Sequence, residues 1–418
     1  MPDKSSKPPL DERHLSAVTK LIHHDYQPPA GFVAPMPGIY KASTVIFPTT
    51  AALRARNWKE KTGYTYGLHG TPTSFILEER LATLEGGLRT LLVPSGLAAI
   101  ALVNAAFLRA GDEVLLPDNV YGPSKELARN ELAHWGITHR VYDPQSADDL
   151  RSKIGSATKL VWLEAAGSVT MEFPDLLGLV RVCREKGVLS ALDNTWGAGV
   201  AFNAFDLQPG DGTSETAEAL GVDISMHALT KYPSGGGDVL MGSVTTRDKA
   251  LHEALAGAHM RIGFGVAGND VELVLRSLPS LALRYAAHDA SARKAAEWFG
   301  TRSEVVQVMH PAIEGSPGHA YWKQVTSQAA GLFSVVFDPK FSAARVDTFI
   351  DALKIFKIGY SWGGPISLVV PYQIANLRSL PFMPKGIVVR FAVGLCDTDD
   401  LIADLASALE VLAGDSQG

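Results

Sequence analysis

Residues 90–111, "TLLVPSGLAAIALVNAAFLRAG", decide the fold class of this chain. "TLLVPS" (90–95) is the short apolar run of a buried strand, and "GLAAIALVNAAFLRAG" (96–111) has the length of a helix and ends on glycine. The window is apolar over about the length of a membrane span, but proline, serine and glycine at 94–96 divide it into a strand and a helix. A strand followed by a helix is the unit of an α/β fold.

The same alternation of strand and helix continues to about residue 250. Further strands are predicted at "DEVLLPD" (112–118), "KLVWLEA" (159–165), "VLSALDN" (188–194) and "VDISMHA" (222–228), and a further helix at "FPDLLGLVRVCREKG" (173–187). This pattern predicts a mainly parallel sheet covered by helices on both faces. Ligands of such sheets bind beyond the carboxyl ends of the strands, so we expect five polar features to converge there: Ser95–Gly96, Tyr121, Glu164, Asp193 and Lys231.

The C-terminal part of the chain follows a different pattern. Residues 252–299 are helical in pattern with an interruption at Pro279, and they look like a connector. Strands and helices then alternate at 332–338, 343–356, 386–394 and 397–414, where Asp397 is a plausible N-cap. We therefore predict three parts: an N-terminal arm (1–64), an α/β domain (65–270), and a connecting helix with a smaller α+β domain (271–418).

Composition favours a small-molecule ligand. The 418 residues are 46% hydrophobic and 20% charged, with a net charge of −6 and no block of Lys or Arg, so neither nucleic acid nor a membrane is an expected partner. Two cysteines form neither a disulfide framework nor a metal-ligand spacing, and the N-terminal 16 residues are too polar for a secretory signal, which indicates the cytoplasm. The adjacent histidines of "IHHDY" (22–26) point different ways, and we predict no metal site.

The position of Lys231 needs an explanation, because in "SMHALTKYPSGGGDVLMGSV" (225–244) this charged residue stands between an apolar strand and a glycine triplet. Desolvation lowers the pKa of a lysine and prepares its amine for a Schiff base. Taken alone, a lysine at a loop is usually solvated. Three features add context. Asp193 is a candidate partner for a protonated pyridine nitrogen or a helix or turn cap, and the turn at 94–100 offers N–H groups to a phosphate. Tyr121 is a candidate for stacking on a ring or for packing at the surface.

The order of these features along the chain resembles that of the fold-type I pyridoxal-phosphate (PLP) enzymes. More narrowly, the chain resembles the Cys/Met-metabolism family, which includes cystathionine β-lyase, γ-synthase and γ-lyase. The resemblance runs from "TKLIH" (19–23) to "LIADL" (401–405) and includes "YGLHGTPT" (66–73), "LEGG" (84–87), "SGLAAI" (95–100), "ALDNTW" (191–196), "TKYPSGGGD" (230–238) and "GLFSVVF" (331–337).

Two segments are similar to the bacterial cystathionine β-lyase branch of that family. They are "LEAAGSVTMEFPD" (163–175), where γ-enzymes usually have Ser-Asn-Pro, and "YSWGG" (360–364). The second segment implies that Ser361 and Trp362 line the substrate pocket.

The resemblance also implies a role for each candidate site residue. Lys231 would carry PLP as a Schiff base and move the Cα proton, and Tyr121 would stack on the ring and assist deprotonation of the substrate amine. Asp193 would pair with the pyridinium. The phosphate would be bound by Gly96, Leu97 and Thr230, and the substrate α-carboxylate by Arg390, whose guanidinium can meet both oxygens.

Tyr66 matches a phosphate-binding tyrosine that the family supplies from the neighbouring subunit. The N-terminal arm is therefore expected to contact that subunit, and dimers with shared active sites are expected to pair into a homotetramer. Two positions later the family usually has a phosphate-binding arginine, whereas this chain has Leu68 followed by His69. Compensation by His69 stays open, although a structural histidine is the favoured interpretation.

The function that the resemblance implies is PLP-dependent α,β-elimination of L-cystathionine to homocysteine, pyruvate and ammonia, a step of transsulfuration and methionine biosynthesis. The first alternative is chemistry at Cγ, as in cystathionine γ-lyase, cystathionine γ-synthase or methionine γ-lyase. The second is a PLP-binding regulatory protein with little activity. Retention of Tyr121, Asp193, Lys231 and Arg390 argues against the second alternative, and Leu68 argues weakly for it.

Overall fold

The computed structural model describes residues 15–23, 31–32, 34–61, 63–208, 219–381 and 385–413. Its larger sheet has seven strands in the order β1-β7-β6-β5-β4-β2-β3. In chain order these are β1 (Arg89–Val93), β2 (Glu113–Pro117), β3 (Thr138–Tyr142), β4 (Thr158–Glu164), β5 (Leu189–Asp193), β6 (Ile224–Ala228) and β7 (Gly242–Thr246).

Four neighbouring pairs in this sheet are parallel, from β3 through β2, β4 and β5 to β6. Strand β7 runs antiparallel to both of its neighbours, β1 and β6. The predicted mainly parallel sheet is confirmed, and all five predicted strands are present. Strands β3 and β7 were not predicted: residues alternate in exposure along β3 at the sheet edge, and β7 begins with glycine and contains no long apolar run.

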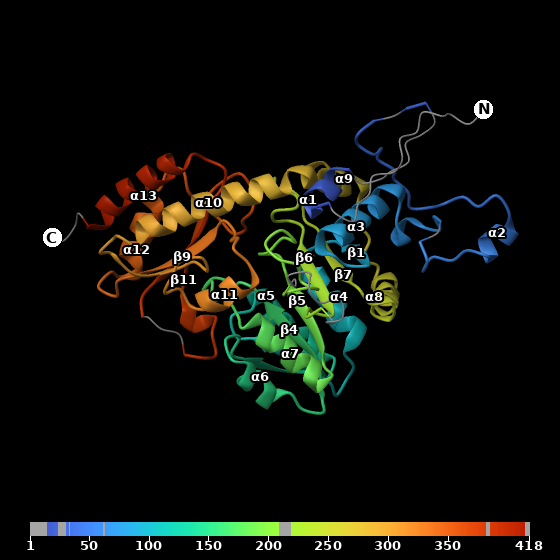
Figure 1. Ribbon diagram of the computed structural model, residues 1–418, viewed down its shortest axis with the longest axis horizontal. Coiled ribbons are helices and arrows are strands. Elements are labelled where there is room, and N and C mark those ends of the chain that lie inside the picture. Colours follow the sequence, from blue (N-terminus) through green and yellow to red (C-terminus); the bar gives the residue numbers. More distant parts are fainter. Residues whose placement is uncertain are drawn as a thin grey trace.

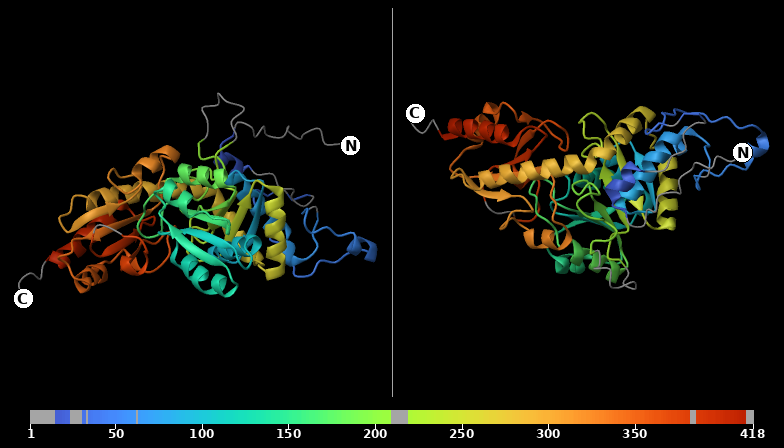
Figure 2. Two further views of the ribbon diagram at one scale, coloured as in Figure 1. Left: turned by 90° about the horizontal axis from the view of Figure 1, so that it is seen from below. Right: turned by 45° about the horizontal axis from the view of Figure 1, so that its top comes forward.

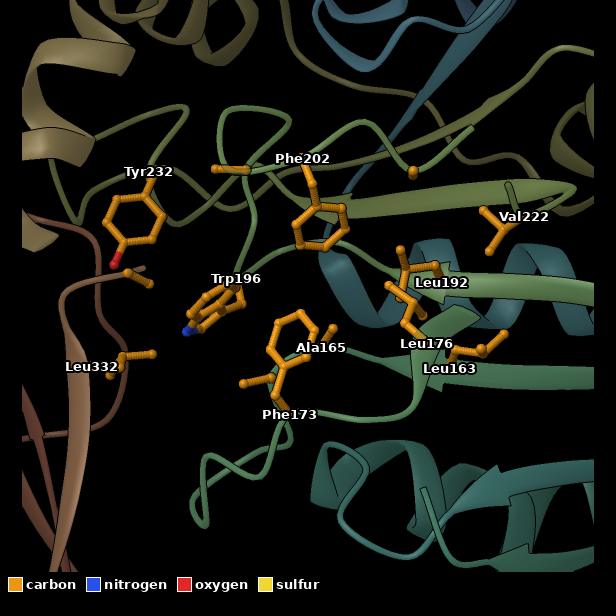
Figure 3. Packing of buried hydrophobic residues seen from close by; sticks show 14 of the residues in the cluster. Leu163, Ala165, Phe173, Leu176, Leu192, Trp196, Phe202, Val222, Tyr232 and Leu332 are labelled. Carbon is orange, nitrogen blue, oxygen red and sulfur yellow. The ribbon is translucent and has the colours of Figure 1, made fainter. Parts of the chain in front are cut away.

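Helices cover both faces of the sheet. Residues alternate between the faces, so Leu92, Leu163 and Leu192 belong to one apolar cluster, whereas Leu91, Val93, Trp162 and Ala191 belong to another. Figure 3 shows part of the first cluster, in which Phe173, Trp196 and Phe202 lie beyond the end of β5. The helices of this part are α3 (Pro72–Glu85), α4 (Gly96–Phe107), α5 (Gly122–Leu127), η3 (Ala128–Leu132), α6 (Ala147–Lys153), α7 (Leu176–Lys186) and α8 (Lys249–Ile262).

A long helical connector leads to the second sheet (Figure 1). The pattern over 252–299 corresponds to the end of α8, then α9 (Gly268–Ser277), the single turn η4 (Leu278–Ser280) and α10 (Leu281–Phe299). Pro279 lies in the turn η4, where its missing N–H interrupts the regular helix. Figure 2 shows α10 running along the smaller sheet.

The smaller sheet has five strands in the order β10-β11-β12-β9-β8. Its strands are β8 (Val305–Met309), β9 (Leu332–Phe337), β10 (Lys357–Ile358), β11 (Leu368–Tyr372) and β12 (Val388–Ala392), and its helices are α11 (His319–Val325), α12 (Ala343–Ala352), η5 (Ile374–Asn376) and α13 (Thr398–Ala413). Phenylalanines of β9, β12, α10 and α12 form its core. As predicted, Asp397 precedes α13, and its side chain accepts a hydrogen bond from Asp399 N at 2.8 Å.

The N-terminal elements are α1 (Ala17–Ile22), α2 (Thr50–Arg54) and η2 (Gly67–His69). Figure 1 shows α2 on a long loop that projects from the remainder of the chain. Within the described ranges, no helix combines the length and the apolar character needed to cross a bilayer. The apolar window at 91–108 is divided between β1 and α4, as predicted.

Candidate active site

A cavity of about 480 Å³ lies at the carboxyl ends of β4, β5 and β6 and extends to the smaller sheet. The larger sheet and its loops contribute Ser95, Gly96, Leu97, Tyr121, Glu164, Asp193, Thr230 and Lys231 to its wall, and the C-terminal part contributes Ser361, Trp362, Tyr372, Arg378 and Arg390. The five polar features expected at one rim therefore do meet. Of the predicted site residues, only Tyr66 lies outside this cavity.

Lys231 follows β6 after a short turn, and its amine points toward the C-terminal segment. Nζ donates a hydrogen bond of 2.8 Å to Ser361 Oγ and lies 5.5 Å from the centre of the Trp362 ring. Burial, together with the nearby Arg390 guanidinium, lowers the pKa of Lys231 to about 8, although Asp193 acts in the opposite direction. A substantial share of the amine is therefore neutral just above neutral pH.

The segment that carries Ser361 and Trp362 approaches the lysine backbone very closely. Gly363 has a φ of +78°, and a Cβ at this position would lie 2.8 Å from Tyr232 N. Ser361 itself has a φ of 101°, which L-residues other than glycine rarely adopt. Gly363 thus permits the left-handed backbone and the close approach to Tyr232. Ser361 adopts an unfavourable conformation that presents its hydroxyl to the lysine amine.

Asp193 ends β5 and is held through one of its two oxygens. Thr195 N donates to Oδ1 at 3.0 Å, and the Thr195 hydroxyl donates to the same oxygen while accepting from Ala228 N at 2.9 Å. The structure gives no hydrogen bond to Oδ2 from any described residue. Burial raises the pKa of Asp193, whereas the Thr195 bonds and the positive charges of His227 and Lys231 act to lower it.

A second carboxyl group lies beside Asp193. Glu164 is opposite Asp193 in the register of β4 and β5, and its Oε2 accepts from Tyr121 N at 2.8 Å. Burial and the neighbouring Asp193 raise the pKa of Glu164 well above its usual range. The Tyr121 pKa is also raised, first by burial and then by these two acids. Glu164 therefore fixes the start of the loop that presents Tyr121.

The start of α4 offers unpaired backbone donors to the cavity. Ser95 caps the helix by accepting a bond of 3.0 Å from Ala98 N, and the N–H groups of Gly96 and Leu97 have no acceptor within the helix. A Cβ at Gly96 would lie 2.6 Å from the Ala228 Cβ, so glycine permits the close approach of α4 to β6. The nearby Thr230 hydroxyl bonds to the backbone of Met241.

Arg390 provides a buried positive charge in the same cavity. It lies on β12 with 8% exposure, and its guanidinium carbon is 5.5 Å from the centre of the Tyr372 ring. Its Nε is buried and has no hydrogen-bond partner among the described residues. Burial lowers the pKa of Arg390, which shows that the charge is poorly solvated. Such a group is suited to an anion brought by a ligand.

An ion-pair network borders the cavity and joins the two sheets. Arg378 Nε donates to Asp118 Oδ2 at 2.7 Å, and its Nη1 donates to Glu172 Oε2 at 2.9 Å. Lys125 approaches the other oxygen of Asp118 at 3.3 Å. Burial would raise the pKa of Asp118, but Arg378 and the neighbouring backbone N–H groups hold it below its usual value. The network fixes the "GSVTME" segment against the C-terminal part.

Tyr66 and its neighbours lie at a different site. Tyr66 is 46% exposed, and Leu68 and His69 line a second cavity of about 390 Å³. His69 Nδ1 is 2.8 Å from Thr65 Oγ1, and its ring stacks on Trp58 at 5.0 Å. Burial is the main cause of its lowered pKa. These contacts support the structural interpretation of His69.

Sequence reasoning missed several residues of the cavity, among them Thr195, Tyr372 and Arg378. Thr195 had a local signal, a hydroxyl two residues after Asp193, whereas the Arg378 side chain bonds to Asp118 and Glu172, which are distant in sequence. Of the segment "IHHDY", the structure describes Ile22 and His23, while 24–26 lie outside the described residues.

The chain matches known proteins over nearly its full length. The model of the family described as "Cys/Met metabolism PLP-dependent enzyme" matches residues 18–410. This chain belongs to the Cys/Met metabolism PLP-dependent enzyme family. The recognition made from its motifs and the expected cofactor are thereby confirmed.

Individual relatives of this family member differ in their named activities. It is 36% identical over 375 residues to the cystathionine beta-lyase of Bordetella avium, covering 88% of this chain and 90% of the relative. It is 33% identical over 385 residues to an L-alanine/L-glutamate racemase of Wolbachia pipientis, covering 89% and 92%. The crystal structure of metB from Corynebacterium glutamicum matches with a TM-score of 0.84 and 27% identity, covering 96% of this chain and all of that chain.

The cavity fits PLP on its own geometry. Oδ2 of Asp193 is available to a pyridinium, the first N–H groups of α4 are available to a phosphate, and the buried Nε of Arg390 has no hydrogen-bond partner in the part of the chain that the structure describes. Lys231 supplies an amine with a lowered pKa between these groups. The donor set therefore matches an anionic aldehyde cofactor and the carboxylate of an amino acid.

Proposed function

We propose that this family member is a carbon-sulfur lyase that cleaves L-cystathionine by α,β-elimination to homocysteine, pyruvate and ammonia. The observation that carries this proposal is the single cavity in which Lys231, Asp193 and Arg390 face one another beside Ser361. The named activity of the Bordetella avium relative and the segments 163–175 and 360–364 support the choice of β-chemistry.

When bound, PLP supplies an electron sink for the charge that develops at the substrate Cα. Lys231 would hold the cofactor through Nζ, and its amine would take the proton from the substrate Cα. In the ligand-free protein the pKa of Lys231 is lowered to about 8, which favours a neutral amine that can accept the Cα proton; the resulting ammonium can pass this proton to the leaving sulfur. Ser361 Oγ, 2.8 Å from Nζ, orients the amine.

Asp193 and Tyr121 are the proposed ring contacts. Asp193 would keep a proton on the pyridine nitrogen, and Oδ2 is the oxygen left for this contact because Thr195 bonds to Oδ1. Tyr121 covers a ring face and assists loss of the proton from the substrate amine. At the phosphate end, the proposed contacts are the N–H groups of Gly96 and Leu97, the Thr230 hydroxyl after it turns from Met241, and Tyr66 of the neighbouring subunit.

Arg390 is the proposed site of the substrate α-carboxylate. A carboxylate there would satisfy the buried Nε and neutralise a charge that is poorly solvated in the free protein. Trp362 lines the same cavity with its ring 5.5 Å from the amine of Lys231, and it is the proposed wall of the substrate pocket together with Ser361.

The proposal extends to organisation and location. We assign 1–64 to an arm on the neighbouring subunit, 65–270 to the cofactor domain, and 271–418 to the connecting helix and C-terminal domain. The protein works as a homotetramer built from dimers with shared sites. The high exposure of Tyr66 and the projecting loop with α2 support a partner at this face. The unpaired cysteines Cys183 and Cys396 are consistent with the reducing cytoplasm.

One assay distinguishes the competing functions. Purified holoenzyme is incubated with L-cystathionine, and both keto acids are measured; L-alanine and L-glutamate are assayed in parallel for racemisation. The proposal predicts pyruvate with homocysteine. Formation of 2-oxobutyrate with cysteine would indicate γ-chemistry, racemisation without cleavage would indicate a racemase, and the absence of all products would favour a regulatory protein.

A further inference from the structure

We propose that Glu85 and His227 act together as positioning residues for Asp193: the charged pair fixes the strand ends around Asp193 and keeps its carboxylate ionised. The inference deepens the proposed function, because it rests on the pairing of Asp193 with the pyridine nitrogen. Neither residue lines the cavity.

The pair is buried, and its histidine lies on the strand that neighbours Asp193. His227 Nε2 lies 2.5 Å from Glu85 Oε1, and the two side chains are 1% and 2% exposed. His227 is on β6, next to Met226, which is the register partner of Asp193 on β5. Asn194 N also donates to Met226 O at 2.9 Å. The imidazole is therefore one residue away from the position directly opposite Asp193.

The second oxygen of Glu85 connects three elements. Oε2 accepts from Ser225 Oγ at 2.7 Å and from Asn194 Nδ2 at 3.3 Å. Glu85 is the last residue of α3, Ser225 lies on β6, and Asn194 follows Asp193 at the end of β5. A single carboxylate thus joins the end of α3 to β6 and to the end of β5, which are two of the strands that lead into the active site.

The charges of the pair depend on each other. Burial raises the pKa of Glu85, but His227 and the bonds from Ser225 and Asn194 outweigh this effect and leave the pKa lowered, so Glu85 is ionised. In the described part of the chain, His227 is the basic group at ion-pair distance from Glu85, and the two carry opposite charges when the imidazole is protonated. A buried carboxylate is stabilised by a cationic partner, and the proposal therefore assigns a positive charge to this imidazole.

The imidazolium in turn acts on Asp193. Burial disfavours the ionised form of Asp193, and the positive charge of His227 opposes this effect. Replacing the Glu85 carboxylate by a neutral group removes the partner that favours a positive charge on His227. Asp193 would then bind a proton more readily, and the pyridine nitrogen would be deprotonated more readily. The inference therefore predicts an electrostatic effect that a purely structural pair would not produce.

Glu85→Gln tests this prediction, because glutamine keeps the shape and the bonds to Ser225 and Asn194 but removes the charge. Glu78→Gln is the matched control: Glu78 lies on the same helix, is 8% exposed, forms an ion pair with Lys61 and accepts from Leu92 N. Holoenzymes are loaded with PLP that carries ¹⁵N in the ring, and the ¹⁵N chemical shift reports whether that nitrogen is protonated. PLP affinity and thermal unfolding are measured on the same samples.

The expected result is that Glu85→Gln lowers the pH of half-protonation of the ring nitrogen by about one unit and weakens PLP binding on the order of tenfold. Glu78→Gln should leave both unchanged. A ring nitrogen as fully protonated in Glu85→Gln as in the natural protein overturns this inference alone. An unprotonated nitrogen in the natural protein overturns the role of Asp193 as well. If Glu85→Gln does not fold, the double variant Glu85→Gln/His227→Gln, which removes both charges, carries the same test.

Discussion

Lys231 and Ser361 join the two sheets across the active-site cavity through a hydrogen bond of 2.8 Å from Nζ to Oγ. Lys231 follows β6 of the larger sheet, and Ser361 precedes β11 of the smaller one. The serine has a φ of 101°, a conformation in which a side chain is strained. Backbone strain of this kind is retained where the surrounding structure and function require it.

Two substitutions separate the strain at Ser361 from the role of its hydroxyl. Ser361→Gly and Ser361→Ala both remove the bond to Lys231, but only glycine relieves the left-handed backbone. Ser361→Gly should therefore be more stable than Ser361→Ala by about 1 kcal/mol in urea unfolding, while the two variants lose activity equally. Equal stability of the two variants would show that the backbone at this position is not strained.

The lowered pKa of Lys231 predicts a pH-dependent stability of the apoprotein. The folded pKa is about 8 and the ordinary value is 10.5, so between these values the unfolded chain holds a proton that the folded chain lacks. The destabilisation of the folded state by the buried ammonium is greatest below pH 8 and disappears as the pH rises to 10.5. Apoprotein with Lys231→Met should be more stable than the natural apoprotein by up to about 3 kcal/mol at pH 7, and this difference should shrink at pH 9 and above. A difference independent of pH would contradict the burial of this charge.

Arg390→Lys keeps the positive charge but loses the planar fork that meets both oxygens of a carboxylate. The loss of a charge-assisted bond of about 1.5 to 3 kcal/mol should lower kcat/KM by roughly 10- to 150-fold, mostly through KM. The visible absorbance of bound PLP should not change, because Arg390 is proposed to contact the substrate. As a control, a substrate analogue without the α-carboxylate should react equally poorly with the natural protein and with Arg390→Lys. An unchanged KM would exclude Arg390 as the carboxylate site.

Arg378→Gln should destabilise the contact between the two sheets. Arg378 is 8% exposed and binds the buried Asp118 and Glu172, so its loss leaves two carboxylates without their main partner. We expect a loss of about 3 to 5 kcal/mol in the free energy of unfolding. Arg151→Gln is the control, because Arg151 also has two acidic partners but is 39% exposed, and it should cost less than about 1 kcal/mol. Similar losses for both variants would contradict the importance of burial at Arg378.

Much of the cavity could be predicted from the chain because its residues follow predicted strands. Glu164 and Asp193 end β4 and β5, Lys231 follows β6, and the Ser95 turn follows β1, so the topology of the sheet brings them to one edge. Strand β7 was not predicted because its antiparallel pairing with β1 and β6, rather than a run of apolar residues, stabilises it.

Contacts between distant segments could not be predicted in this way. Glu85 lies in the segment "LEGG", but its partners Ser225 and His227 belong to a strand far along the chain. Arg378 likewise bonds to Asp118 in the larger sheet. Their partners are determined by how α3 and the C-terminal part pack on the larger sheet, and no local pattern encodes that packing. Leu68 remains the main departure from the family pattern, at a face where a neighbouring subunit is proposed.

The most direct test of the proposed site is to identify the lysine that holds the cofactor. Holoenzyme is reduced with borohydride, which makes the link to PLP permanent, and the labelled peptide is identified by mass spectrometry. The account predicts one labelled residue, Lys231, and no label in Lys231→Ala, which should also lack turnover of L-cystathionine. A label on a different lysine, or full turnover by Lys231→Ala, would contradict the account.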